Sequence, residues 1–202
     1  MNLPLLWSLY SFRSELKYVA GVFIGVLLLP IIAILVVTQT GIEIVSDSLA
    51  EFDEITQTIQ LKNPLDGSIY KEISGSFLWP TNGVITLRFG QSSIYQPFHA
   101  GLDIAGKRGD PVAAFMKGKV TFAGGISWGY GNHVIIDHGD NISSIYAHLG
   151  KISVAKGDEV EQGQIIGTQS DTGWATGPHL HFETRIFGIP VNPMIFLASA
   201  TQ

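Results

Sequence analysis

Residues 173–186 read GWATGPHLHFETRI, which predicts a strand that follows a turn-rich segment. Because side chains alternate across a strand, His179 and His181 point to one face of it. Leu180 and Phe182 then point to the other face. Two imidazoles about 7 Å apart can share one small site, and the turn-rich residues before them would hold the strand end at a cleft. The alternative is a pair of surface histidines on an exposed strand.

Short β-branched and aromatic runs fill the chain on the N-terminal side of this stretch, and glycine, aspartate and asparagine turns separate them. The runs are GVITLRFG, PVAAF, GKVTFAGG, HVIIDHG, SSIYAHL and IIGTQS. No long helical period interrupts them. This pattern is typical of an antiparallel all-β domain, which we predict over residues 77–202.

A second pair of metal-ligand side chains lies at His99 and Asp103, in the segment HAGLD. Four steps along a straight strand separate two side chains by roughly 13 Å, which is too far for one metal ion. The backbone must therefore bend between them, and Gly101 is where it can bend. Together with one histidine of the 179/181 pair, these residues offer two imidazoles and one carboxylate. That set suits zinc and leaves a fourth position for water.

The other histidines divide into two groups. His148, in the segment YAHL, and the remaining histidine of the 179/181 pair are available for proton transfer and for stabilising charge. His133 and His138 lie at turns, where we predict a solvated or backbone-bonded role. On residue types alone, the alternative to a zinc hydrolase is a set of scattered structural histidines.

Three segments in this order and spacing resemble the signature of the M23 family of lysostaphin-type, LytM-like zinc metallopeptidases. They are HAGLD at 99–103, YAHL at 146–149 and GPHLHFE at 177–183. Intervening segments such as WGYGN at 128–132 are similar too. The resemblance covers about residues 79–192.

The resemblance implies that His99, Asp103 and His181 bind Zn²⁺ and that His148 and His179 are catalytic. It also implies a compact antiparallel β-sheet domain with a substrate groove along one sheet. The implied substrates are peptidoglycan peptides, either stem-peptide cross-links or bridges. Some family members are inactive regulators that have lost these side chains, whereas here all five positions are filled. The short loop 89–98, which would help to wall the groove, lacks the family's usual pattern.

We therefore predict a zinc-dependent endopeptidase that hydrolyses peptide bonds in peptidoglycan with metal-activated water. We expect His179 to act as the general base, because strand geometry holds it beside His181. His148 would then stabilise the oxyanion of the tetrahedral intermediate. Two alternatives share these residues: a membrane-anchored, non-catalytic wall-binding or regulatory LytM-like module, and a zinc peptidase with a protein substrate.

The apolar run at residues 18–37 is uncharged and long enough to span a bilayer as a single helix. Arg13 and Lys17 precede it and acidic residues follow it. The positive-inside rule then places residues 1–17 in the cytoplasm and the β domain outside, on the periplasmic or cell-wall side. A cleaved signal peptide is the alternative, but its apolar region usually has only about 7 to 15 residues. We predict a single-pass anchor in the cell membrane.

Residues 38–76 form an acidic spacer, predicted to be partly helical. Seven acidic and two basic side chains between residues 40 and 75 give −5, which equals the formal charge of the whole chain. Ser48 and Glu51 form a capping-box pattern, and apolar residues recur at helical spacing as far as Ile59, before Asn63-Pro64. We expect this apolar stripe to pack on the domain or on a second copy. Binding of an envelope protein partner is the alternative.

Composition excludes several classes of function. The chain has no cysteine, which excludes disulfides, thiolate zinc sites and a cysteine nucleophile. It carries 12 basic and 17 acidic residues, and no basic cluster exceeds two residues. Nucleic acid is therefore not expected as a partner.

Overall fold

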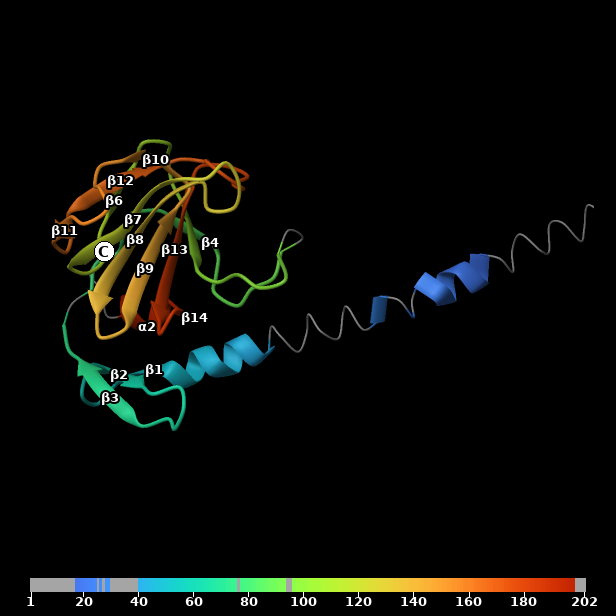
Figure 1. Ribbon diagram of the computed structural model, residues 1–202, viewed down its shortest axis with the longest axis horizontal. Coiled ribbons are helices and arrows are strands. Elements are labelled where there is room, and N and C mark those ends of the chain that lie inside the picture. The colour runs from blue at the N-terminus through green and yellow to red at the C-terminus, as the bar shows by residue number, and fades with distance from the viewer. Residues whose placement is uncertain are drawn as a thin grey trace, which may run out of the picture. The chain divides into compact units, whose positions relative to one another are not determined.

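The computed structural model describes residues 17–24, 26, 28–29, 40–75, 77–93 and 96–198. Its largest sheet has eight strands, all paired antiparallel, in the order β11-β7-β8-β9-β13-β5-β4, with β14 paired to β13 (Figure 1). These strands are β4 (Val84–Leu87), β5 (Leu102–Ala105), β7 (Gly118–Gly125), β8 (Asn132–Gly139), β9 (Ile142–Ala147), β11 (Glu159–Val160), β13 (His179–Ile186) and β14 (Ile189–Val191). The antiparallel all-β domain predicted from the strand and turn pattern is confirmed.

A smaller antiparallel sheet and a short helix complete the domain. The sheet has the order β10-β12-β6, from β10 (Leu149–Ile152), β12 (Ile165–Gln169) and β6 (Pro111–Ala113), and the helix is α2 (Met194–Leu197). Fully buried side chains of both sheets and of α2 belong to one apolar core. At its centre the Phe115 ring lies 5.4 Å from that of Phe182 and 5.8 Å from that of Phe196. Aromatic contacts of this kind add to the stabilisation from burial alone.

Strand β13 separates the core from the polar side of the large sheet. Leu180 and Phe182 are fully buried in the core, as the alternation predicted for a strand requires. β13 pairs with β5 on one side and with β9 on the other. The two histidines of β13 therefore lie between side chains supplied by both neighbouring strands.

The helix predicted from Ser48 onward is wrong. Residues 40–49 are helical, and an antiparallel sheet of β1 (Ala50–Asp53), β2 (Thr58–Lys62) and β3 (Ile69–Ile73) follows. The Asp53 carboxylate accepts hydrogen bonds from the N–H groups of Ile55 and Thr56, at 2.8 and 3.2 Å, and so closes a turn where the helix was expected. Polar and apolar residues alternate in TIQLK of β2. This two-residue period outweighs the helical spacing of the apolar residues.

The β1-β2-β3 sheet packs on the rest of the domain. Leu49, Ile59 and Leu61 are fully buried and join the same apolar core as Phe196 of α2. Residues 42–202 accordingly form one compact unit. Of the apolar stripe expected to pack on the domain, Leu49 and Ile59 are buried in the core, whereas Ile55 is exposed.

Polar and aromatic contacts tie β3 to the turns at one end of the large sheet. The Tyr70 hydroxyl donates a hydrogen bond to the Asp140 carbonyl at 2.9 Å, and Lys71 Nζ lies 3.3 Å from an Asp140 carboxylate oxygen. The Tyr70 ring also lies 5.4 Å from the Phe187 ring. These contacts fix the edge of the small sheet against the β8–β9 and β13–β14 turns.

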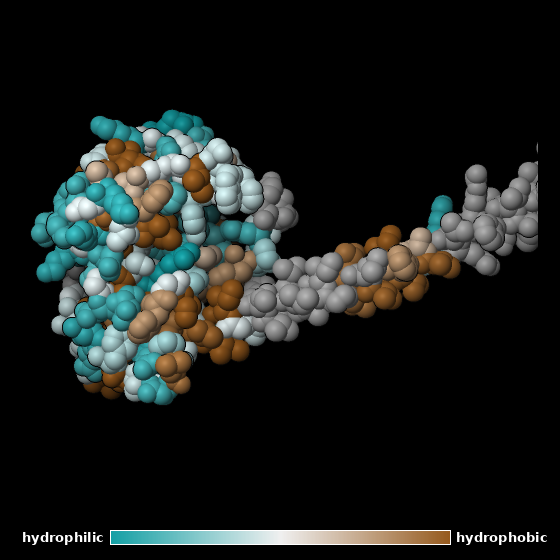
Figure 2. Space-filling view, viewed as in Figure 1, coloured by the Kyte–Doolittle hydropathy of each residue, from teal (hydrophilic) through white to brown (hydrophobic). Residues whose placement is uncertain are grey.

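The apolar run predicted as a membrane anchor is described at residues 18–24, 26 and 28–29, and its other residues lie outside the described part. The described residues are helical and expose apolar side chains, drawn in brown in Figure 2. Within the described residues, no helix combines the length and the apolar character needed to cross a membrane.

His133 and His138 have the predicted backbone-bonded roles, although both lie within β8 and not at turns. His133 Nδ1 donates to the Gly131 carbonyl at 2.9 Å, and His138 Nδ1 donates to the Lys117 carbonyl at 2.8 Å. His138 Nε2 also lies 2.7 Å from the buried Ser144 hydroxyl. Both rings therefore support the structure of the large sheet.

We expect His138 to make the folded protein sensitive to acid. Burial lowers the pKa of His138 to about 4, from the ordinary value of 6.5. Between these pH values the unfolded chain binds a proton that the folded chain does not. The contribution of His138 to the free energy of unfolding is therefore fully present above pH 6.5 and is lost as the pH falls to about 4. One group shifted this far accounts for roughly 3 kcal/mol across the range.

The measurement is denaturant unfolding of wild type and His138→Asn at a series of pH values in this range. Chelator-treated protein is used, so that loss of a metal ion does not contribute. Asn can keep the hydrogen bond to Lys117 but cannot take up the proton. The unfolding free energy of His138→Asn should fall less steeply with decreasing pH than that of wild type, and parallel curves would contradict the assignment.

Candidate metal centre

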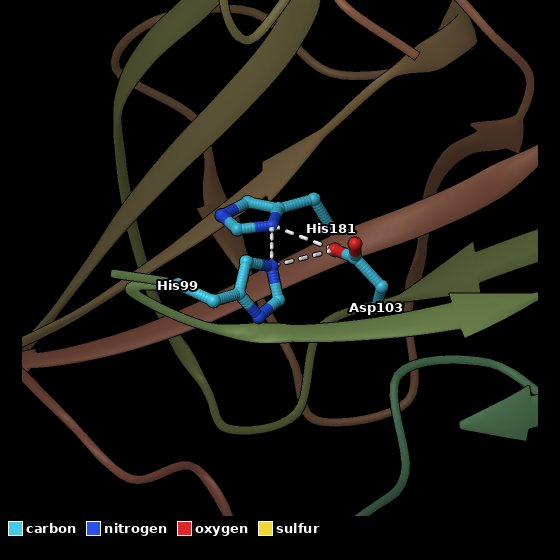
Figure 3. Close-up of side chains that lie close together, drawn as sticks. All are labelled: His99, Asp103 and His181. Atoms are coloured by element: carbon cyan, nitrogen blue, oxygen red, sulfur yellow. Dashed lines mark hydrogen bonds and ion pairs between the residues drawn. The ribbon is translucent and has the colours of Figure 1, made fainter. Parts of the chain in front are cut away.

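The three predicted metal ligands meet at β5 and β13 (Figure 3). Asp103 and His181 are register partners on these strands, and Asp103 Oδ1 lies 2.8 Å from His181 Nδ1. His99 comes from the loop before β5, and its Nε2 lies 3.0 Å from each of those two atoms. The ligand atoms all lie within 4.8 Å of one another. They are close enough to share one metal ion.

The segment that joins His99 to β5 runs tightly against β13. A Cβ on Gly101 would lie 2.4 Å from the carbonyl oxygen of Phe182, so only glycine lets the two backbones approach this closely. This is the position where the sequence predicted a bend. His99 is fully buried, and its Nδ1 donates to the Arg88 carbonyl at 3.1 Å. Its Nε2 is thereby left to face the cluster.

The two predicted catalytic histidines border the cluster. The His148 and His179 ring centroids lie 4.7 Å apart, and His179 Nε2 lies 3.8 Å from Asp103 Oδ1. Each ring directs Nδ1 to a backbone carbonyl at 2.8 Å, that of Thr172 for His148 and that of Gly177 for His179. Because a carbonyl only accepts, Nε2 carries the lone pair in each neutral ring. All five site residues predicted from the sequence therefore lie together.

His148 occupies a sharp corner of the backbone. It lies between the end of β9 at Ala147 and the start of β10 at Leu149, and its φ is +60°. Histidine adopts this left-handed conformation more readily than most residues. Burial lowers the pKa of His148 to about 4, although the hydrogen bond to Thr172 acts in the opposite direction. The imidazole is therefore neutral at physiological pH.

His181 lies between two carboxylates. Its Nδ1 faces Asp103, and its Nε2 lies 3.0 Å from Glu183 Oε1. Burial would lower the pKa of His181, but the hydrogen bonds to Asp103 and Glu183 raise it to about 9. Burial would likewise raise the pKa of Asp103, but hydrogen bonds from His181 and His99 hold it well below its usual range. A metal ion bound at His181 Nδ1 would thus displace a proton, and its affinity would fall with decreasing pH.

A buried network around Glu183 supports His181. Glu183 is fully buried; its Oε1 accepts from His181 Nε2 and, at 2.6 Å, from the Tyr130 hydroxyl. Its Oε2 accepts from Arg185 Nε at 2.7 Å. A carboxylate that accepts from the distal nitrogen of a metal-binding histidine fixes the ring and its tautomer. The two-residue period of β13, which places Glu183 on the same face as His181, is the signal that could have revealed it.

We expect Glu183→Gln to weaken zinc binding about 10- to 100-fold, the usual effect of losing such a supporting carboxylate. The amide removes the charge that holds the Nε2 proton of His181, while the side chain keeps its size. Zinc affinity is measured by competition with a chromogenic chelator. Tyr130→Phe removes only one hydrogen bond to the same carboxylate and should have a smaller effect. Wild-type affinity in both variants would show that the network does not position His181.

The fold and the site together define a class: an antiparallel β-sheet protein with a His–Asp–His cluster that could hold a metal ion and two further histidines beside it. The family model described as peptidase family M23 matches residues 97–193. The catalytic domain of lysostaphin from Staphylococcus simulans is 35% identical, with a TM-score of 0.54, over 58% of this chain and 93% of that domain. The chain belongs to peptidase family M23.

Other relatives are similar to this chain over only part of their own length. The DD-carboxypeptidase/endopeptidase Mpg of Neisseria meningitidis is 48% identical over 96 residues, which are 48% of this chain and 22% of Mpg. The murein hydrolase activator NlpD of Escherichia coli is 41% identical over 119 residues, which are 59% of this chain and 30% of NlpD. The chain thus spans about a fifth to a third of the length of these curated relatives. A zinc containing peptidase from Vibrio cholerae is 30% identical, with a TM-score of 0.57, over 71% of this chain and 47% of that structure.

Proposed function

We propose that the protein is a zinc-dependent endopeptidase that hydrolyses peptide bonds in peptidoglycan. The observation that carries this proposal is the cluster of His99, Asp103 and His181 with two more histidines at its border. A structural metal site would have no need of His148 and His179 beside it. A hydrolase needs such groups to move a proton.

The donor set fits zinc. Two imidazole nitrogens and one carboxylate oxygen suit zinc better than calcium or magnesium, which prefer oxygen ligands. Three protein ligands are typical of catalytic zinc sites, which keep a fourth position open. When bound, zinc would polarise a carbonyl group and lower the pKa of a water molecule to about 7.

His148 is the better candidate for the general base. Thr172 holds its Nδ1 proton and burial keeps the ring neutral, so Nε2 is ready to accept a proton from the attacking water. The same nitrogen then passes the proton to the leaving amine. His179 directs Nε2 toward the cluster. With a second proton taken up from solvent before the step, its ring would donate from Nε2 to the oxyanion while Nδ1 still donates to the Gly177 carbonyl. Burial, which keeps the His148 ring neutral, thus supports the reverse of the assignment expected from strand geometry.

The relatives support peptidoglycan as the substrate class. Lysostaphin, Mpg and NlpD are described by name as an antimicrobial peptidase, a DD-carboxypeptidase/endopeptidase and a murein hydrolase activator. Murein lies outside the cytoplasm. We therefore place the β domain on the extracytoplasmic side, with residues 18–37 as a single-pass anchor in the cell membrane, because this run is apolar and basic residues precede it.

The test uses the full-length protein, because β1–β3 contribute side chains to the core. Purified peptidoglycan is incubated with the protein, with and without a zinc chelator, and released fragments are identified by mass spectrometry. New peptide termini that disappear with chelator and return with added zinc are the expected result. Their identity gives the bond that is cleaved. A folded, zinc-loaded protein that releases nothing from walls of several types would overturn the proposal.

A second candidate function is activation of a separate wall hydrolase by a non-catalytic domain. The observation in its favour is the 41% identity to the murein hydrolase activator NlpD. Such a module would release no fragments by itself, and its effect on a partner hydrolase would persist when His148 is replaced. The acidic spacer at residues 38–76 would then be the surface for an envelope partner.

A further inference from the structure

Two tryptophans stand exposed beside His148. Trp128 and Trp174 expose 60% and 76% of their surfaces, although indoles usually bury most of theirs. Their ring centroids lie 6.2 Å apart and the ring planes are inclined by 53°. The two rings thus form an open apolar platform on the protein surface. Exposed aromatic clusters of this kind mark binding sites.

The two loops that carry these rings are joined to each other. The backbone N–H of Trp174 donates to the Gly129 carbonyl at 2.9 Å. A Cβ on Gly131 would lie 2.5 Å from Thr172, and one on Gly173 would lie 2.4 Å from the Gly129 carbonyl oxygen. Glycines at these points let the loops approach closely. The platform is therefore held in place before any ligand arrives, which lowers the entropic cost of binding.

The same loops hold His148. Its Nδ1 donates to the Thr172 carbonyl at 2.8 Å, and its N–H donates to the Tyr130 carbonyl at 2.9 Å. Thr172 and Tyr130 are two residues from Trp174 and Trp128, respectively. The platform is thus continuous with the catalytic side of the metal centre. A substrate that extends past His148 would reach the indole rings.

The two loops that carry the platform are uncharged. Residues 126–131 and 172–178 contain no Asp, Glu, Lys or Arg. The nearest acidic residue in sequence, Asp171, is paired with Arg108. On these loops a cationic ligand would therefore find no carboxylate, and an anionic ligand would find no Lys or Arg side chain. The chemistry suits a neutral ligand with a flat C–H face and polar edges, which describes the ring of an N-acetylated sugar.

We propose that Trp128 and Trp174 form a subsite that stacks on a neutral N-acetylated sugar of the peptidoglycan glycan strand, while the attached peptide reaches the metal centre. This inference rests on the proposed function. It assigns the platform to the carbohydrate part of the substrate rather than to its peptide. The protein would then select peptides that are still attached to glycan.

The first experiment measures binding of the tetramer of N-acetylglucosamine, which has no peptide, to the full-length zinc-loaded protein by calorimetry. Trp128→Ala and Trp174→Ala should each weaken binding at least about tenfold, the usual effect of truncating an aromatic anchor. Phe187→Ala is the matched control, since it removes an exposed aromatic side chain at the opposite end of β13. It should bind like wild type. The corresponding glucose tetramer tests whether the acetamido group is recognised.

The second experiment compares cleavage of cross-linked peptides that carry their disaccharide with cleavage of the same peptides after the sugar is removed. The ratio of kcat/KM for the two substrates should fall about tenfold in either tryptophan variant and stay constant in Phe187→Ala. An unchanged ratio, or a wild-type protein that does not bind the tetramer, would overturn the subsite. A wild-type protein that binds the tetramer but cleaves neither substrate would overturn the proposed function and leave the subsite supported.

Discussion

Asp103→Ala is expected to yield a folded protein that no longer retains zinc and whose kcat/KM for peptidoglycan fragments falls at least about 10³-fold. Asp103 supplies the one carboxylate of the cluster and lies between its two imidazoles, 3.0 Å from His99 Nε2 and 2.8 Å from His181 Nδ1. Without it, two neutral nitrogens remain, and the charge that balances the cation is lost. Zinc content after dialysis and cleavage rate are measured on the same preparation.

The matched control is Asp137→Ala, which removes an exposed carboxylate from β8 of the same sheet. This variant should keep both zinc and activity. Circular dichroism and a thermal melt of Asp103→Ala establish that it folds. An Asp103→Ala protein that holds one equivalent of zinc and cleaves at the wild-type rate would show that the metal lies elsewhere.

His148→Asn is expected to reduce kcat roughly 10²- to 10⁴-fold while zinc content stays at the wild-type level. Asparagine tolerates the positive φ of this position and can still donate to the Thr172 carbonyl, so the corner between β9 and β10 should persist. What it cannot do is accept a proton at the position of Nε2. The measurement is single-turnover cleavage together with metal analysis.

His138→Asn is the control for this substitution. It makes the same chemical change at a histidine whose hydrogen-bond partners, Lys117 and Ser144, are not site residues. It should turn over like wild type near neutral pH. If His148→Asn retained full activity, the base would be His179 or solvent. A His148→Asn protein that lost zinc would instead have a disturbed metal centre.

The composition of the site could be predicted because its residues are chemically distinctive. Alternation in β13 puts His179 and His181 on one face, and the spacing of His99 and Asp103 demands a bend. Strand spacing alone left open which histidine of β13 is the ligand, and only the family resemblance chose His181. The register supplies the physical reason, because His181 is paired with Asp103 whereas His179 is paired with Ala105. Pairing between strands so distant in sequence leaves no local signal.

Two features could not be predicted from local pattern. The helical spacing from Leu49 to Ile59 gave way to strands, because the Asp53 side chain stabilises a turn and β2 alternates in a two-residue period. The support of His181 by Glu183 also depends on Tyr130, which the loop between β7 and β8 brings to the same carboxylate. Such networks are set by tertiary packing, and the residue types alone do not specify them.

The pairing of β5 with β13 also has a consequence for biogenesis. Asp103 and His181 are separated by 78 residues and His99 and His181 by 82, so the site closes a long loop of the chain. Contacts of such high sequence separation form slowly, because the chain must first pay the entropy of loop closure. During synthesis, which starts at the N-terminus, His99 and Asp103 are added to the chain long before the residues of β13. The cluster of His99, Asp103 and His181 would therefore be complete only once almost the entire domain has been synthesised and β13 has paired with β5.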